Sequence, residues 1–178
     1  MRTIESSQRP RVIVDGGEID KMHRFVAEAK KQGIYVTISP FWAHQEAPKS
    51  WGLEGYDNVS PWGLMFFNDK LKDAYKAWVR KLYEPKNPYT GIPLAQDPAV
   101  AIIQVKNEDS LLFWTTQAIK PEQQRVLGRK FGDWLRKKYG TLDKALAAWD
   151  GDKHENDRFG DGVVGILMIW EMTQDRTG

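Results

Sequence analysis

Apolar positions recur along the chain at two spacings, which predict helices and strands in alternation. Over residues 18–32 they follow one another at helical steps, and Gly33 then supplies a common helix stop. The same spacing predicts further helices over 68–83 and 121–139 and a short one over 141–149. Continuous apolar runs predict three buried strands, at 34–39, 100–105 and 163–170.

Strands that read as unbroken apolar runs are typical of parallel sheets covered by helices on both faces, so the predicted fold class is α/β. A right-handed β/α layout fits a barrel or an open sheet, although no GxGxxG or GxxxxGKS follows any run. In both architectures ligands bind beyond the carboxyl ends of the strands. Those ends read "SPFWAH", "KNEDS" and "WEMTQ".

Length and charge narrow the function classes. A chain of 178 residues with 41% hydrophobic content predicts one globular unit over 1–178. The net charge of +2 comes from intermixed basic and acidic residues without a polybasic block, so nucleic acid is not an expected partner. No apolar run reaches the roughly 20 residues of a spanning helix, so no membrane partner is expected.

Compartment and cofactor follow less directly from the sequence. The first residues, "MRTIESSQRP", lack the apolar core of a signal peptide, but a precursor could have lost one, so the compartment and the oligomeric state stay open. Without cysteine there is no disulfide and no thiolate metal site. The 3 histidines are widely separated, so neither a catalytic zinc site nor another metal or cofactor is expected.

Polar residues at the three strand ends, with tryptophans beside them, fit carbohydrate chemistry better than phosphate or hydride chemistry. Glycoside hydrolysis needs one carboxylic acid to protonate the leaving oxygen and a second carboxylate as nucleophile or base. Glu108 is the candidate for the first, and Asn107 is a candidate donor to a sugar hydroxyl. The alternative is a solvated turn in which Asn107 and Asp109 cap the next helix.

Aromatic residues on loops supply further candidates for carbohydrate contact. The chain has 8 tryptophans, and Trp42, Trp62 and Trp114 fall in predicted loops, where an indole either stacks on a sugar or packs the loop. Trp134 instead falls on a stripe predicted to face the core. His44 could bind a sugar hydroxyl or tune an acid, and an ordinary surface histidine is the alternative.

An apolar strand that ends in Asn-Glu, "IIQVKNE", resembles the fourth-strand acid/base motif of the retaining β-glycosidase clan built on (β/α)8 barrels. "GIYVTISPFW" resembles the third strand of that clan. "FGDWLRKKYGTLDKALAAW" is similar to the helices after the fourth strand in galactosidase-like and cellulase-like members. The resemblance spans nearly the whole chain. It implies a partial TIM barrel of about strands 2 to 5, with Arg2 near the end of the second strand and "VVGILMIWE" as the fifth.

The nucleophilic glutamate of that clan ends the seventh strand, beyond the last element of this sequence. The resemblance therefore implies a truncated glycoside hydrolase domain, cleaving β-linked poly- or oligosaccharides when intact and inactive in isolation. Glu171 could alternatively be the nucleophile, because neighbouring strands about 4.8 Å apart suit the roughly 5–5.5 Å of a retaining pair. A role for Glu171 in contacting substrate is favoured over that pairing.

Two other functions remain open at this point. A noncatalytic carbohydrate-binding remnant would keep the cleft without the nucleophile. A metal-dependent α/β hydrolase would use the strand-end acids to hold a metal ion that polarises a phosphate or carbonyl.

Overall fold

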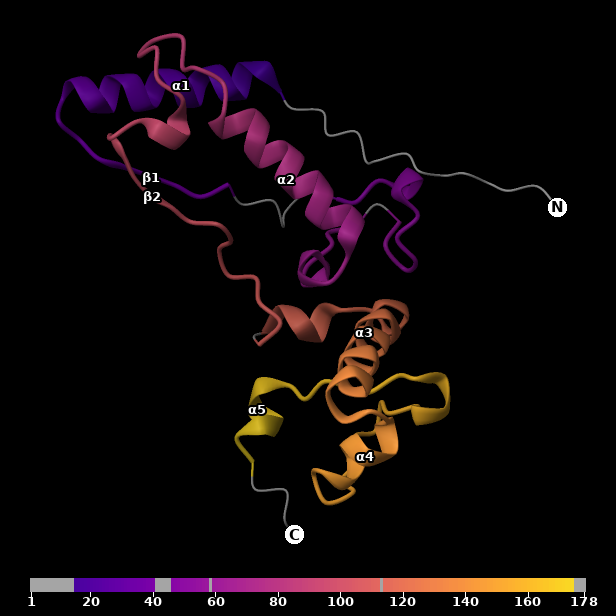
Figure 1. Cartoon of the computed structure of the whole chain (residues 1–178). Coiled ribbons are helices and arrows are strands. Elements are labelled where there is room, and N and C mark those ends of the chain that lie inside the picture. The colour runs from indigo at the N-terminus through magenta and orange to yellow at the C-terminus, as the bar shows by residue number, and fades with distance from the viewer. Residues whose placement is uncertain (1–14, 41–45, 58, 113, 175–178) are drawn as a thin grey trace. The chain divides into compact units, whose positions relative to one another are not determined.

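The computed structural model describes residues 15–40, 46–57, 59–112 and 114–174. They form two compact units, each assembled from two stretches of the chain (Figure 1). Unit 1 combines residues 1–44 with 68–108, and unit 2 combines 45–67 with 109–178. The prediction of a single domain over 1–178 stays a prediction.

Unit 1 contains two helices and two strands among its described residues. In chain order they are α1 (Gly16–Lys31), β1 (Val36–Ile38), α2 (Asp69–Tyr83) and β2 (Val100–Ile103). Asp15 begins α1 by accepting a hydrogen bond from the Gly17 amide, and Asn68 caps α2 through the Leu71 amide. The order β1–α2–β2 is that of a βαβ unit.

The two strands pair in parallel, as predicted, but both are shorter than the apolar runs that predicted them. Val36 is opposite Val100 and Ile38 is opposite Ile103, with an irregularity between Val36 and Thr37. One face of β1 packs with α1 and α2 into an apolar core. The core contains Val26, Ala29, Val36, Ile38, Leu82, Tyr83, Leu94 and Ala99.

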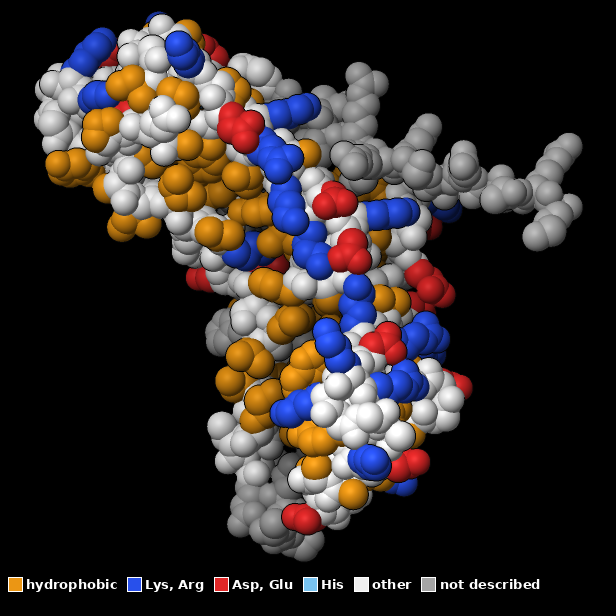
Figure 2. Space-filling model, in the orientation of Figure 1, with side chains coloured by type: hydrophobic (Ala, Val, Ile, Leu, Met, Phe, Trp, Pro, Cys, Tyr) orange, Lys and Arg blue, Asp and Glu red, His pale blue; other side chains and the backbone are white. Residues whose placement is uncertain are grey.

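Among the described residues β2 is not covered on both faces, although its unbroken apolar run is typical of a covered strand. Ile102 is 59% exposed and Ile103 is 43% exposed, and Val105 just beyond the strand is 64% exposed. Apolar side chains therefore reach the surface of unit 1 (Figure 2). The described residues have mixed helix and sheet, which agrees with the α/β class. A two-stranded sheet does not extend to a barrel, so the partial barrel stays a prediction.

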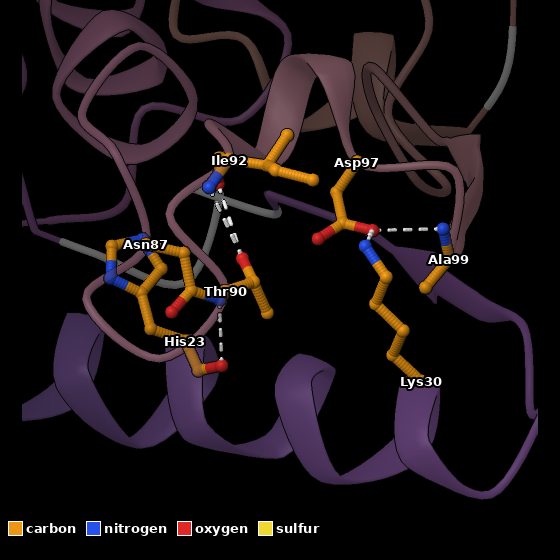
Figure 3. A network of polar contacts seen from close by, with 7 residues as sticks. All are labelled: His23, Lys30, Asn87, Thr90, Ile92, Asp97 and Ala99. Atoms are coloured by element: carbon orange, nitrogen blue, oxygen red, sulfur yellow. Dashed lines mark hydrogen bonds and ion pairs between the residues drawn. The ribbon is translucent and has the colours of Figure 1, made fainter.

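A buried polar network joins the connector after α2 to α1 (Figure 3). The Asp97 carboxylate, fully buried, accepts hydrogen bonds from the Ala99 amide at 3.0 Å and the Lys30 ammonium at 2.9 Å. Asn87, also fully buried, donates to the His23 carbonyl at 2.9 Å. Because buried polar groups are costly without partners, these bonds hold the connector against α1.

Unit 2 contains α3 (Pro121–Tyr139), α4 (Leu142–Ala147) and α5 (Ile169–Met172) among its described residues (Figure 1). Pro121 at the first position suits the start of α3, and Thr141 caps α4 through the Lys144 amide. Leu135, Leu142, Ala145 and Val164 form its buried core. No described helix in either unit is long and apolar enough to cross a bilayer.

The predicted third strand, 163–170, is not a strand in the structure. Val163 makes only an isolated antiparallel bridge with Arg158, and Ile169 begins α5. Val163 and Val164 are buried, and the Val164 amide donates to the Gly128 carbonyl on α3. The first two residues of the run pack against α3, and apolar periodicity alone does not distinguish such packing from a sheet.

Two glycines on α3 make this close packing possible. A Cβ on Gly128 would lie 2.7 Å from Val163 Cγ1, and a Cβ on Gly132 would collide with the Gly162 carbonyl oxygen. Gly128 and Gly132 are one helical turn apart, so they open a single strip along α3. The backbone of 162–164 occupies that strip.

We expect Asp97→Asn to lower the free energy of unfolding by about 1–3 kcal/mol at pH 7, as for loss of a buried charged hydrogen-bond partner. Burial alone would raise the pKa of Asp97, but the Ala99 amide and Lys30 outweigh it and lower the pKa. The carboxylate therefore stabilises the fold fully above its unfolded pKa of about 3.9, and this is lost as pH falls through the lower folded pKa. The difference between Asp97→Asn and the unchanged protein should shrink over that acidic range in urea unfolding.

The matched control is Glu28→Gln, which removes the exposed Lys31–Glu28 pair on the same helix. It should change stability by less than about 0.5 kcal/mol. A pH-independent penalty for Asp97→Asn would contradict the proposed role of the charge.

Gly132→Ala should lower the free energy of unfolding by about 1–3 kcal/mol, because the added methyl group overpacks the contact with Gly162. Alanine normally stabilises a helix relative to glycine by roughly 0.5–1 kcal/mol, so the sign is diagnostic. Gly16→Ala in α1, where nothing lies within 4 Å, is the control and should not destabilise. Thermal and urea unfolding measure both, and a stabilising Gly132→Ala would refute the packing.

Candidate functional site

The predicted site residues are distributed over both units. Asn107 and Glu108 end unit 1, whereas Trp62, Trp114 and Glu171 belong to unit 2. Three further predictions, Arg2, Trp42 and His44, lie outside the described residues. Each unit is described by itself below.

Glu108 lies five residues past the last residue of β2. The backbone amide of Gln104 donates to the Ile38 carbonyl at 2.9 Å, so the hydrogen bonding between the two strands continues one residue beyond β2. The Glu108 side chain is exposed and its backbone φ is +50°. Such left-handed backbone costs a glutamate on the order of 1 kcal/mol or more, and residues held this way gather at functional sites.

The segment between β2 and Glu108 is fastened by side chains of unit 1. The Tyr75 hydroxyl on α2 donates to the Val105 carbonyl, and burial raises the pKa of Tyr75. Asn107 Oδ1 accepts a hydrogen bond from Gln104 Nε2 at 2.8 Å. This hydrogen bond turns the side-chain oxygen of Asn107 toward Gln104. The predicted donation to a sugar hydroxyl would therefore come from Nδ2 of Asn107.

The helix-capping alternative for Asp109 does not match the structure. The side chain of Asp109 is buried in unit 2, and its Oδ1 accepts a hydrogen bond from the Gly63 amide at 2.9 Å. Gly63 has φ +75°, and a Cβ there would lie 3.0 Å from Ile119. Asp109 therefore holds the loop that carries Trp62.

Trp62 and Trp114, 52 positions apart, are brought together in unit 2. Their ring centroids are 5.1 Å apart and the ring planes are tilted by 43°. Thr115, beside Trp114, accepts from the Ser110 amide and donates to the Ser110 carbonyl. Trp114 is 43% exposed, so the pair presents an indole whose neighbours are fixed by hydrogen bonds.

Glu171 is not at the end of a strand, which corrects the prediction. It lies in the first turn of α5, where its Oε2 accepts a hydrogen bond from the Met168 amide at 2.6 Å. A carboxylate is favourable there because the first amides of a helix lack partners within the helix. The spacing argument for a Glu108/Glu171 pair on neighbouring strands therefore no longer applies, and the role of Glu171 in substrate contact stays a prediction.

The partner of Glu171 is His154, a residue that sequence reasoning missed. His154 Nε2 lies 3.3 Å from Glu171 Oε1, and His154 Nδ1 accepts from the Asn156 amide at 3.2 Å. Asp157 organises the same loop, because its two carboxylate oxygens accept from the amides of His154 and Gly165. The polar segment "DGDKHENDRFGDG" gave no signal that His154 would meet a residue 17 positions later.

Trp134 also differs from its prediction. It is 52% exposed and stacks on Phe131, with ring centroids 5.9 Å apart and planes 14° apart. Lys138 lies 5.0 Å from the Trp134 ring centroid. The indole thus lies at the edge of the core-facing stripe of α3 and covers Phe131.

Within the described ranges, no group of three or more histidine, aspartate or glutamate side chains lies close enough to hold a metal ion. Comparison of the chain with protein-family models, with curated proteins and with solved structures found no match. The resemblance to retaining β-glycosidases therefore rests on the sequence patterns alone.

If the tryptophan pair stacks on sugars, cellotetraose or a β-galacto-oligosaccharide should quench the intrinsic fluorescence of the protein. Trp114→Ala should then weaken binding by about two- to tenfold, the range expected for one aromatic contact. Trp134→Ala removes an indole of similar exposure, 52% against 43%, outside the pair and serves as the control. Equal effects of the two substitutions, or no effect of Trp114→Ala, would contradict the role of the pair.

Proposed function

We propose that the chain is part of a retaining glycoside hydrolase that cleaves β-linked poly- or oligosaccharides, with Glu108 as its acid/base. The observation that carries this proposal is the setting of Glu108. An exposed carboxyl on left-handed backbone follows the carboxyl end of a strand in a parallel pair. That end of a parallel sheet is where α/β proteins bind ligands.

In the proposed reaction, Glu108 protonates the leaving-group oxygen and later removes a proton from the attacking water. Its exposed side chain suits both steps, since water and substrate must reach the same oxygen atoms. Asn107 donates through Nδ2 to a sugar hydroxyl. The stacking of Trp62 and Trp114 on sugar rings is a separate part of the proposal, made for unit 2 by itself. These roles are parts of the proposal.

The order β1–α2–β2 supports the barrel that the proposal requires, because a strand, a helix and a parallel strand form its repeating unit. The exposed face of β2 is compatible with further elements that would cover it in the intact enzyme. The second carboxylate of a retaining mechanism is expected on a strand outside the 178 residues. The proposed activity therefore belongs to the intact enzyme.

The test uses the longest reading frame that contains this sequence, with Glu108→Gln and a control, Glu84→Gln, at another exposed glutamate of unit 1. Glu108→Gln should lower kcat/KM by about 10²–10⁴-fold on oligosaccharides, whose leaving groups need protonation. Dinitrophenyl glycosides need little protonation, so they should lose far less. Glu84→Gln should leave both substrates unaffected.

Equal losses on both substrate types would assign Glu108 a structural role and sink the proposal. Activity lost on chelation and restored by a divalent cation would favour the metal-dependent alternative. Turnover by the 178-residue chain alone would show that its own carboxylates suffice for hydrolysis. That result would contradict the expectation that the nucleophile lies outside these residues.

A further inference from the structure

Unit 2 contains a cavity of about 360 Å³ that the proposed hydrolase chemistry does not use. Its walls come from α3, Trp149 just past α4, the loop 152–157, the run 164–167 and α5. Small-molecule sites commonly enclose roughly 300–1,000 Å³, so the cavity is large enough for a ligand of modest size.

The apolar walls of the cavity are held in place by the protein itself. Trp149 Nε1 donates to the Asp152 carbonyl at 2.8 Å, and Tyr139 meets the Trp149 ring edge-on. Phe131, on the α3 wall, is stacked on Trp134. Leu167 and Met172 complete the apolar surface, so the cavity has aromatic and aliphatic walls.

The polar part of the cavity lining is acidic. Asp152 and Asp157 line it together with His154, whose partner Glu171 adds a third carboxylate, and the lining contains no lysine or arginine. Two basic side chains of the neighbouring loop contact other groups. Arg158 donates to the carbonyls of Glu155 and Asp157, and Lys153 lies 6.0 Å from the Phe159 ring centroid.

We propose that this cavity binds an organic ammonium ion that carries an apolar substituent. Aromatic faces attract ammonium groups, and the surrounding carboxylates attract them further. The substituent would lie against Leu167 and Met172. A saccharide fits less well because the polar side chains bond within the protein: Asp157 to two amides, and His154 to Glu171.

The test is a titration of the 178-residue chain with benzyltrimethylammonium, followed by NMR of the Met172 methyl and Trp149 indole signals. Both signals should shift and saturate. Benzyl alcohol, which has the ring without the charge, should bind about tenfold more weakly, and methyl β-glucoside should not compete. The experiment needs neither Glu108 nor glycosidase activity, so it stands independently of the proposed hydrolase function.

Asp152→Asn should weaken benzyltrimethylammonium binding by roughly three- to tenfold, as for loss of one nearby charge. Asp150→Asn is the matched control, because it removes the same charge two residues away, outside the lining, where the φ of +60° suits asparagine. Gly165→Ala should weaken binding further, because the added Cβ would collide with His154 Nδ1. Gly160→Ala, with nothing within 4 Å, should have no effect.

Three results would overturn the proposal. The first is equal binding of benzyl alcohol or tighter binding of the glucoside, which would make the occupant a neutral ring or a sugar. The second is an equal effect of Asp150→Asn and Asp152→Asn, which would reflect net charge alone. The third is no shift of either signal at about 10 mM benzyltrimethylammonium, which would leave no binding of practical strength.

Discussion

The buried Asp97 carboxylate is the interaction on which the arrangement of unit 1 depends. It fixes the Ala99 amide, and the Ala99 carbonyl in turn accepts the Val36 amide at 2.7 Å, so one side chain determines where β2 meets β1. A slip of one residue would turn every side chain of a strand to the opposite face. The position of Glu108 follows from this register, because it lies only five residues past the last residue of β2. The position of the strand end is thus tied to a charge buried at the strand start.

The arrangement of unit 2 depends instead on close packing. Its central contact is steric: Gly128 and Gly132 let the backbone of 162–164 approach α3 closely enough for a hydrogen bond between Val164 and Gly128. This contact positions Gly165 and the run after it, which form one wall of the cavity. Asp157 also holds this wall in place, because its carboxylate accepts hydrogen bonds from the backbone amides of His154 and Gly165. The aromatic walls therefore depend on small residues as much as on large ones.

Sequence reasoning found what depends on local signals. All four predicted helices are present near their expected bounds, because apolar spacing and capping residues such as Asn68 and Thr141 act within a few positions. The strand runs at 34–39 and 100–105 also contain the two observed strands. Contacts between residues far apart in the chain could not be predicted from these local signals. The run at 163–170 begins with two valines that pack on a helix. Neither the Trp62–Trp114 contact nor the His154–Glu171 contact could be predicted from the sequence.

The left-handed backbone at Glu108 has a consequence for how this position evolves. At φ +50° glycine, asparagine and aspartate are the residues that a turn under no chemical demand accumulates, because each adopts this conformation at lower cost. Under the proposed function, the backbone preference at position 108 and the need for a carboxyl group favour different residues. Glycine or asparagine at this position in related proteins would indicate that residue 108 serves only to form the turn. Retention of glutamate there, despite its less favourable backbone, would indicate selection for its carboxyl group.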